Sequence, residues 1–282
     1  MVVTVALAAA VCFALASVLQ QQAAVAVPAE HRLRIGLITR LVRRPRWLAG
    51  IGADLAGYAL QVLALDNGPL ALVQPLLAAG LLFALVFNEA ATHRGMRRED
   101  WLAALATAGG LAVFVAFGAP KGAASEPAPW TWAAFSTVTA GAVIVALFLA
   151  SRRGAAGRAA LLAAGAGIAF ALSAALTKQS LAELHEGFHQ LITTGYLYGL
   201  IVCGATGMLL AQSAFQSGAL AASLPMLSLS EPVYAVLAGA ILFHEHLRSG
   251  WQGVVAVLGA AVAAVAVVYL ARSPSAQPVI VP

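Results

Sequence analysis

The stretch Phe13-Ala-Leu-Ala-Ser-Val-Leu-Gln-Gln-Gln22 occurs twice in this chain, the second time as Phe170-Ala-Leu-Ser-Ala-Ala-Leu-Thr-Lys-Gln179. Two further pairs follow in the same order and at largely the same spacing: Gly68 to Pro75 with Gly218 to Pro225, and Arg98-x-x-Trp101 with Arg248-x-x-Trp251. The chain therefore contains a duplicated unit. In an apolar chain a duplication is typical of secondary transporters, whose substrate site lies where the two halves meet.

The composition places this duplication in a membrane. Hydrophobic residues make up 61% of the 282 residues, charged residues only 10%, and the mean hydropathy is +0.89. A soluble domain carries about a quarter charged residues, so we expect the lipid bilayer to surround this chain. The basic residues exceed the acidic ones by 16 to 11, but they stand in short loops between apolar runs. That placement favours contact with anionic lipid headgroups and excludes nucleic acid as a partner.

Runs of about twenty apolar residues predict the membrane-spanning helices. They occupy residues 2–22, 47–65, 69–88, 101–118, 130–150, 159–178, 191–213, 218–243 and 251–271. The sequence therefore predicts an all-α integral membrane protein of about nine transmembrane helices.

The two repeats divide the chain into halves of four helices each. Residues 1–118 form the first repeat and residues 159–272 the second, while residues 119–158 hold a connecting loop, the fifth helix and another loop. Residues 273–282 form a tail. Because a single connecting helix is an odd number of crossings, the halves must insert with opposite orientations. We therefore expect two inverted repeats joined by a central helix.

Loop charges predict which way the protein sits in the membrane. With nine spans, thirteen basic residues fall on the side that includes loop 28–46, and only Lys121, Lys178 and Arg248 fall on the other. The positive-inside rule then places the N-terminus outside and the C-terminus in the cytoplasm of a cell (inner or plasma) membrane. Within that loop, the alternation of Arg and apolar residues over 31–42 fits either a short interfacial helix or a solvated basic loop.

Two carboxylates fall inside predicted spans, where an ionisable group is costly and marks a functional candidate. Asp54 lies about two turns into the predicted helix 47–65, and Glu231 lies near the middle of 218–243. Asp54, Tyr58 and Gln61 are spaced i, i+4, i+7 and so share one helical face. That face could coordinate a cation, relay protons or hold a polar solute. The alternative is a hydrogen bond between helices with no further role.

Prolines predict helix interruptions at matched positions of the two repeats. Pro75 and Pro225 are repeat partners, and Pro232 directly follows Glu231. Matched interruptions are the best sequence indication of a transporter's binding site. Gln74, beside Pro75, adds an amide to the candidate site, and a simple packing kink is the alternative for each proline.

One motif indicates a different class of protein. His185-Glu-Gly-Phe-His189 matches H-E-x-x-H, which on a helix places two histidines on one face to hold zinc in metalloproteases. The motif falls in an external loop, Gly187 weakens a helix there, and no third ligand follows at a suitable spacing. We therefore expect no enzyme and no cofactor, and keep loose cation capture by His185 and His189 as an alternative.

The repeated pattern resembles the drug/metabolite transporter superfamily (EamA-like). The shared features are a Phe-Ala-Leu-Ser-like first helix, a proline-containing helix with an acidic ending (Phe87-Asn-Glu89, Phe243-His-Glu245) and Arg-x-x-Trp before a Gly-rich helix. The first half is more specifically similar to the NIPA-like branch of magnesium transporters. The matching residues are Gly36-Leu-Ile-Thr-Arg40, Trp47, Gly50, Pro69 through Leu76, and Gly118-Ala-Pro120. The positions that carry Glu and Asn in the second helix of that branch are Tyr58 and Gln61 here.

Residues and resemblance together predict a permease that moves a small molecule or cation by alternating access. Its charged groups would be Asp54 and Glu231; Tyr58, Gln61 and Gln74 would be polar contacts; Pro75, Pro225 and Pro232 would shape the site. The alternatives are a magnesium or divalent-cation transporter using the same two acids, a membrane component that transports nothing, and a membrane metalloprotease. Surfaces rich in Gly and Ala would also allow a homodimer.

Overall fold

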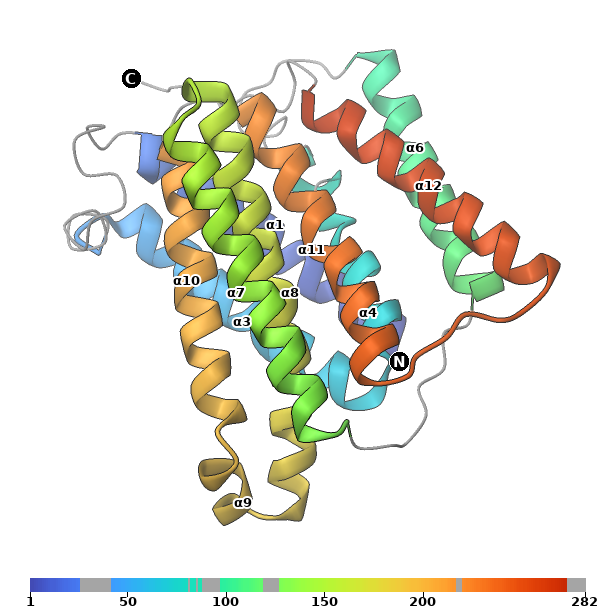
Figure 1. Ribbon diagram of the computed structural model, residues 1–282. Helices are drawn as coiled ribbons and strands as arrows, with labels where there is room; N and C mark the ends of the chain where they lie inside the picture. The colour runs from blue at the N-terminus through green and yellow to red at the C-terminus, as the bar shows by residue number, and fades with distance from the viewer. Residues whose placement is uncertain are drawn as a thin grey trace.

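The computed structural model describes residues 1–25, 42–80, 82–84, 86–87, 97–118, 127–216 and 220–272. Within these ranges the regular secondary structure is helical (Figure 1). The elements are α1 (Val2–Val25), α3 (Pro45–Asn67), α4 (Leu70–Leu77), α6 (Arg98–Val113), the π-helix η2 (Phe114–Gly118), α7 (Pro129–Ser151), α8 (Ala155–Glu186), α9 (Phe188–Thr193), α10 (Tyr196–Gln216), α11 (Leu220–Leu242) and α12 (Trp251–Arg272).

Seven helices are long and apolar enough to cross a membrane within the described residues. They are α1, α3, α6 with η2, α7, α8, α10 and α12. Two shorter apolar helices, Leu70–Ala84 and Met226–Leu242, lie at the other two positions that the sequence predicts. The chain is thus an all-α membrane protein, whereas the count of nine spans stays a prediction.

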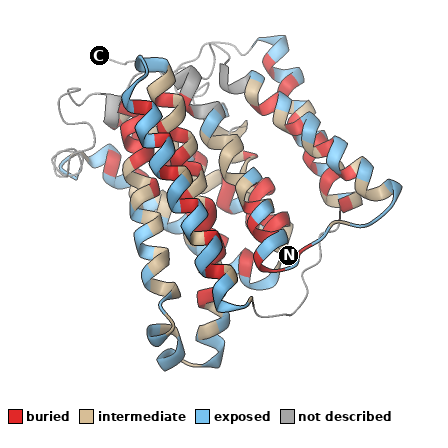
Figure 2. Cartoon of the chain, in the orientation of Figure 1, coloured by how far each residue is buried: buried red, intermediate tan, exposed pale blue. Residues whose placement is uncertain are grey.

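The surface of the helices is apolar where lipid would lie. Large apolar side chains of α7 and α12, such as Ile144, Phe148, Leu258 and Val265, are more than half exposed. Figure 2 shows these helices with exposed outer and buried inner faces. The core instead gathers on α8, most of whose residues from Leu162 to Ser180 are buried. Lipid contact accounts for the exposed apolar residues, since hydrocarbon replaces water around a membrane helix.

Packing arranges the helices around α8 and α1. The central helix α8 packs against α7, α10 and α11, while α1 packs against α3, α4 and α10. Helices α6 and α12 pack on one another and lie beside the remaining bundle (Figure 1). Gly110 and Gly259 allow this pair to approach, because a Cβ on Gly110 would lie 2.5 Å from the carbonyl oxygen of Gly259.

Residues at repeated positions make repeated contacts. A Cβ on Gly57 of α3 would lie 3.0 Å from the ring of Phe13 in α1. A Cβ on Gly207 of α10 would lie 2.7 Å from the ring of Phe170 in α8. Phe170 is the repeat counterpart of Phe13. Gly207 is the counterpart of Gly57, because the two are 150 residues apart, as Pro225 and Pro75 are. Each half therefore packs a phenylalanine ring against a glycine at corresponding positions.

A second contact also recurs, between the first and third helices of each half. A Cβ on Gly80 would lie 3.1 Å from the carbonyl oxygen of Ala10. In the second half Gly167 packs against Ser230, and its Cβ would lie 2.8 Å from the backbone nitrogen of Glu231. By the same offsets Ala10 corresponds to Gly167 and Gly80 to Ser230. Small residues at both crossings allow the backbones to approach closely.

The structure differs from the sequence-based expectations in the length of two helices. Helix α8 runs to Glu186, two turns past the predicted end at 178. Helix α4 ends at Leu77, and after a turn at Ala78 and Ala79 the described residues 80, 82–84 and 86–87 are helical again, so the predicted helix 69–88 is interrupted. Several predicted features lie outside the described residues: most of the loop segment 31–42, Glu89, residues 119–126 of the connecting loop and the tail 273–282.

Candidate functional site

A cavity of about 420 Å³ lies among α1, α3, α4, α8, α10 and α11. The five polar residues that the sequence analysis selected all line it: Asp54, Tyr58, Gln61, Gln74 and Glu231. They come from three helices that are far apart in the sequence. The structure therefore brings the predicted polar contacts together, and their role in binding stays a prediction.

Asp54 is held by a chain of amide groups. The Nε2 of Gln20 donates to the Oδ2 of Asp54 at 2.5 Å, and the Nε2 of Gln212 donates to the Oε1 of Gln20 at 2.6 Å. Gln20 and Gln212 are 4% and 1% exposed, so the two amides of this chain from α10 through α1 to α3 are buried. Sequence reasoning missed Gln20 as a partner of Asp54 although Gln20 lies in the repeated stretch.

Tyr58 reaches across the cavity to α8. Its hydroxyl lies 2.9 Å from Oγ1 of Thr177. Because the Thr177 hydroxyl donates its one proton to the carbonyl oxygen of Ser173, Tyr58 is the donor of this bond. Thr177 is the repeat counterpart of Gln20, so corresponding positions of the two halves each hold a polar residue of α3.

Glu231 and Gln74 differ from Asp54 and Tyr58 because their side chains have no partner among the described residues. Gln74 is 1% exposed, yet neither Oε1 nor Nε2 makes a hydrogen bond. The Glu231 carboxylate makes neither a hydrogen bond nor an ion pair there. Ser228 and Pro232 line the cavity beside it, and Pro232 lacks the N–H that would bond the Ser228 carbonyl.

Two of the three prolines do not interrupt a helix as the sequence predicts, whereas Pro75 is followed by a break in its helix. Pro225 and Pro232 both lie within α11, which is helical throughout Leu220–Leu242, so neither interrupts the helix. A proline removes only one backbone donor, and the rest of the helical ladder can continue around it. Pro75 is buried inside α4 and does not line the cavity, and the helix ends two residues later. Pro232 lines the cavity, whereas the side chain of Pro225 lies outside the described part of the chain.

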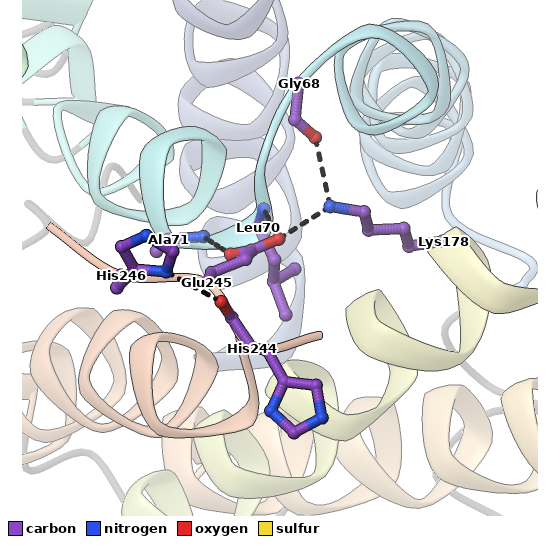
Figure 3. Close-up of polar contacts among 7 residues, drawn as sticks. All are labelled: Gly68, Leu70, Ala71, Lys178, His244, Glu245 and His246. Carbon is purple, nitrogen blue, oxygen red and sulfur yellow. Dashed lines mark hydrogen bonds and ion pairs between the residues drawn. The ribbon is translucent and has the colours of Figure 1, made fainter. Parts of the chain in front are cut away.

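Glu245 accepts three hydrogen bonds that join three segments of the chain (Figure 3). Its Oε1 accepts from Lys178 Nζ at 2.6 Å and from the backbone N–H of Leu70 at 2.8 Å, and its Oε2 accepts from the N–H of Ala71 at 2.7 Å. The Glu245 side chain is fully buried, and that of Lys178 is 23% exposed. We call Lys178, Glu245, Leu70 and Ala71 the latch.

The latch satisfies a helix terminus that has no cap of its own. Pro69 stands at the N-cap of α4 and offers no side-chain oxygen to the first backbone N–H groups. The carboxylate of Glu245 takes that role, and its negative charge also suits the positive end of the helix dipole. Lys178 donates in addition to the carbonyl oxygen of Gly68 at 3.4 Å. Lys178 thus pairs with Glu245 and not with Glu231, the acid inside α11.

The latch and the cavity follow one another along three helices. On α4 the cavity lining begins at Gln74, just C-terminal to the latch. On α8 and α11 the lining ends at Ala174 and Pro232, N-terminal to the latch. The latch thus joins the start of α4, the second half of α8 and the segment after α11 at one end of the cavity.

The H-E-x-x-H segment does not have the geometry of a zinc site. Helix α8 ends at Glu186, and Gly187, with a φ of 137°, separates it from α9. His185 and His189 therefore lie on different helices and do not share a face. His185 Nε2 lies 3.5 Å from Oδ1 of Asp66. The described residues contain no group of three His, Cys, Asp or Glu side chains that could hold a metal ion.

Fold and cavity together define a helical membrane protein with a polar interior site. No family model matches the chain, and no solved structure matches it. The chain is similar to Cgl0250/cg0304, an uncharacterized protein of Corynebacterium glutamicum, with 27% identity over 276 residues. The similarity covers 95% of this chain and 93% of that relative, so it extends over both halves of the duplication.

Proposed function

We propose that this protein is a permease that moves a small solute across the membrane by alternating access. The observation that carries the proposal is the cavity with two carboxylates, which the latch closes at one end. Carboxylate and amide groups buried in a cavity among apolar helices are costly unless they serve a solute, because hydrocarbon cannot satisfy them. With the N-terminus outside, the latch belongs to the outer end and the cavity is approached from the cytoplasm.

The repeated contacts support an inverted-repeat mechanism. Phe13 with Gly57 and Phe170 with Gly207 give each half the same internal packing. In transporters built of inverted repeats, the two facing states arise when the halves exchange conformations around a fixed site. The recurring contacts are what such an exchange requires, since each half must be able to adopt the packing of the other.

The latch makes the two ends of the cavity unequal. By the repeat offset, the counterpart of Lys178 in the first half is Gln21, while the motif counterpart of Glu245 is Glu89, which lies outside the described residues. Gln21 carries no charge, so the Lys–Glu pair of the latch cannot recur at the corresponding positions of the first half. A contact present in only one of two states shifts the equilibrium toward that state. We therefore propose that the resting protein is closed at the latch.

Thiol labelling from both sides of the membrane tests this proposal without a known substrate. Ser17 lines the cavity, and Ser17→Cys in a Cys12→Ala, Cys203→Ala background gives it one reactive group. We expect a membrane-impermeant maleimide to label it in inside-out and, more slowly, in right-side-out vesicles. Val145→Cys, on the exposed apolar face of α7, is the matched control and should resist labelling from either side. Labelling of Ser17→Cys from one side only, even when Lys178 is replaced by Met, would contradict alternating access.

A further inference from the structure

We propose that the solute is an organic cation with a single positive charge and an apolar body, and that Glu231 and Gln74 receive its charged end. This inference rests on the proposed permease function and assigns the substrate class of the same cavity. It follows from the charge of the lining, from the unequal bonding of its polar groups and from its aromatic walls.

The described lining residues indicate that the solute carries a positive charge. They include the carboxylates of Asp54 and Glu231 but no Lys, Arg or His. Lys178 lies one turn beyond the lining of α8, and its charge is paired with that of Glu245. An anionic solute would meet only like charge, whereas a cation would be attracted and would relieve the cost of burying a carboxylate.

The two carboxylates are not equally available. One oxygen of Asp54 accepts a short hydrogen bond from Gln20, which Gln212 holds in turn. The carboxylate of Glu231 has no such partner among the described residues. A solute with one charge is therefore expected to approach Glu231, while Asp54 is fixed by protein groups and adds a longer-range attraction.

The unbonded side-chain amide of Gln74 is independent evidence that the cavity binds a polar group. Buried amides are normally hydrogen-bonded, and an exception calls for an explanation. Both amide atoms of Gln74 lack a partner in the described structure although the residue is 1% exposed, and it lines the cavity. The amide oxygen can accept from an ammonium group or lie against the polarised methyl groups of a quaternary one. Gln74 thus provides the neutral acceptor that would complete a site for a monovalent cation.

Aromatic and apolar walls select an organic cation over a metal ion. Phe13, Phe170, Phe215 and Met208 line the cavity along with Tyr58. Ring faces attract cations and also bury apolar groups, and about 420 Å³ is within the range of pockets for small organic ligands. Magnesium instead needs six oxygen ligands in octahedral geometry and gives up its water reluctantly. The described residues hold no group of three acidic or histidine side chains for it.

Equilibrium dialysis of the purified full-length protein in detergent tests the inference. Radiolabelled benzyltrimethylammonium is the probe, with its uncharged isostere neopentylbenzene, tetramethylammonium and Mg²⁺ as competitors. We expect the labelled cation to bind, tetramethylammonium to compete at least tenfold more weakly because it lacks the apolar body, and neopentylbenzene and Mg²⁺ not to compete. Glu231→Gln should weaken binding at least tenfold and Gln74→Leu about three- to tenfold, whereas Glu186→Gln, an exposed acid at the end of α8, should leave it unchanged.

Each outcome of the dialysis and labelling experiments either supports or contradicts the proposed substrate class. Competition by neopentylbenzene as strong as by the cation would overturn the inference on the wild-type protein alone, even if the variants failed to fold. Mg²⁺ binding that is lost in Glu231→Gln would replace the organic cation by the divalent one. If Ser17→Cys is labelled from both sides but no cation binds, the substrate class is wrong and the permease stands. If the cation binds but labelling is one-sided, the permease is wrong and a cation-binding membrane protein remains.

Discussion

The Nζ of Lys178 lies 2.6 Å from Oε1 of Glu245, an ion pair that joins α8 to the segment after α11 at the first turn of α4. The same carboxylate accepts the backbone N–H groups of Leu70 and Ala71. One acidic side chain therefore connects the two halves of the duplication at one end of the cavity. Any movement that opens this end must break the ion pair and uncap α4.

Removing the cation of this pair should destabilise the protein measurably. Breaking a buried pair by removing one partner costs about 3–5 kcal/mol. We expect less for Lys178→Met, because Lys178 is 23% exposed and Glu245 keeps its two backbone donors. The matched control is Glu99→Gln in the exposed Arg97–Glu99 pair at 3.0 Å, which should cost below about 1 kcal/mol. Unfolding in mixed detergent micelles measures both, and equal effects would refute the latch.

The crossing of α8 and α11 should tolerate no added methyl group. In Gly167→Ala the new Cβ would meet the Ser230 side chain and lie 2.8 Å from the Glu231 nitrogen. Overpacking of this kind costs about 1–3 kcal/mol. Gly141→Ala on α7 is the control, because its Cβ meets no atom within 4 Å and Ala favours a helix by up to about 1 kcal/mol. If both variants unfold at the same detergent fraction, the close approach is not a feature of the folded protein in solution.

Gln20 should matter more than its repeat counterpart. Gln20→Leu removes the donor to Asp54 and the acceptor of Gln212, and each buried group left unsatisfied costs about 1–3 kcal/mol. Thr177→Val removes only the neutral acceptor of Tyr58. We therefore expect Gln20→Leu to lower both the unfolding stability and the affinity for benzyltrimethylammonium further than Thr177→Val does. The reverse order would show that the amide chain does not hold Asp54.

His185 and His189 should not form a metal site. Because Gly187 ends α8 between His185 and His189, no helical face presents both. We expect His185→Ala and His189→Ala to leave Zn²⁺ affinity unchanged in calorimetric titration. A titratable zinc site abolished by either change would restore the H-E-x-x-H interpretation.

Local patterns predicted the parts of the structure that depend on one helix. The spacing of Asp54, Tyr58 and Gln61 places them on one face, and all three line the cavity. Composition predicted the all-α membrane class for the same reason, since each span must satisfy its own backbone. The break at Ala78 and Ala79 follows Pro75, the residue at which the sequence predicts an interruption.

Contacts between distant segments could not be predicted in this way. Glu245 lies 175 residues after Leu70, and nothing in its local sequence identifies it as a helix cap. The available signal was at α4 itself, where Pro69 precedes the helix and supplies no side-chain oxygen, so that a cap had to come from elsewhere. The link from Gln212 through Gln20 to Asp54 was hidden likewise, because a buried Gln and an interfacial one look alike in sequence.

Counterflow in proteoliposomes measures the central claim most directly. Vesicles loaded with unlabelled benzyltrimethylammonium are diluted into a trace of the labelled cation, with wild-type protein, Glu231→Gln or Glu186→Gln in the membrane. We predict transient accumulation of label with the wild-type and Glu186→Gln proteins, and its loss with Glu231→Gln. Accumulation no greater than in protein-free vesicles, or equal accumulation with all three proteins, would contradict a permease that works through the acidic cavity.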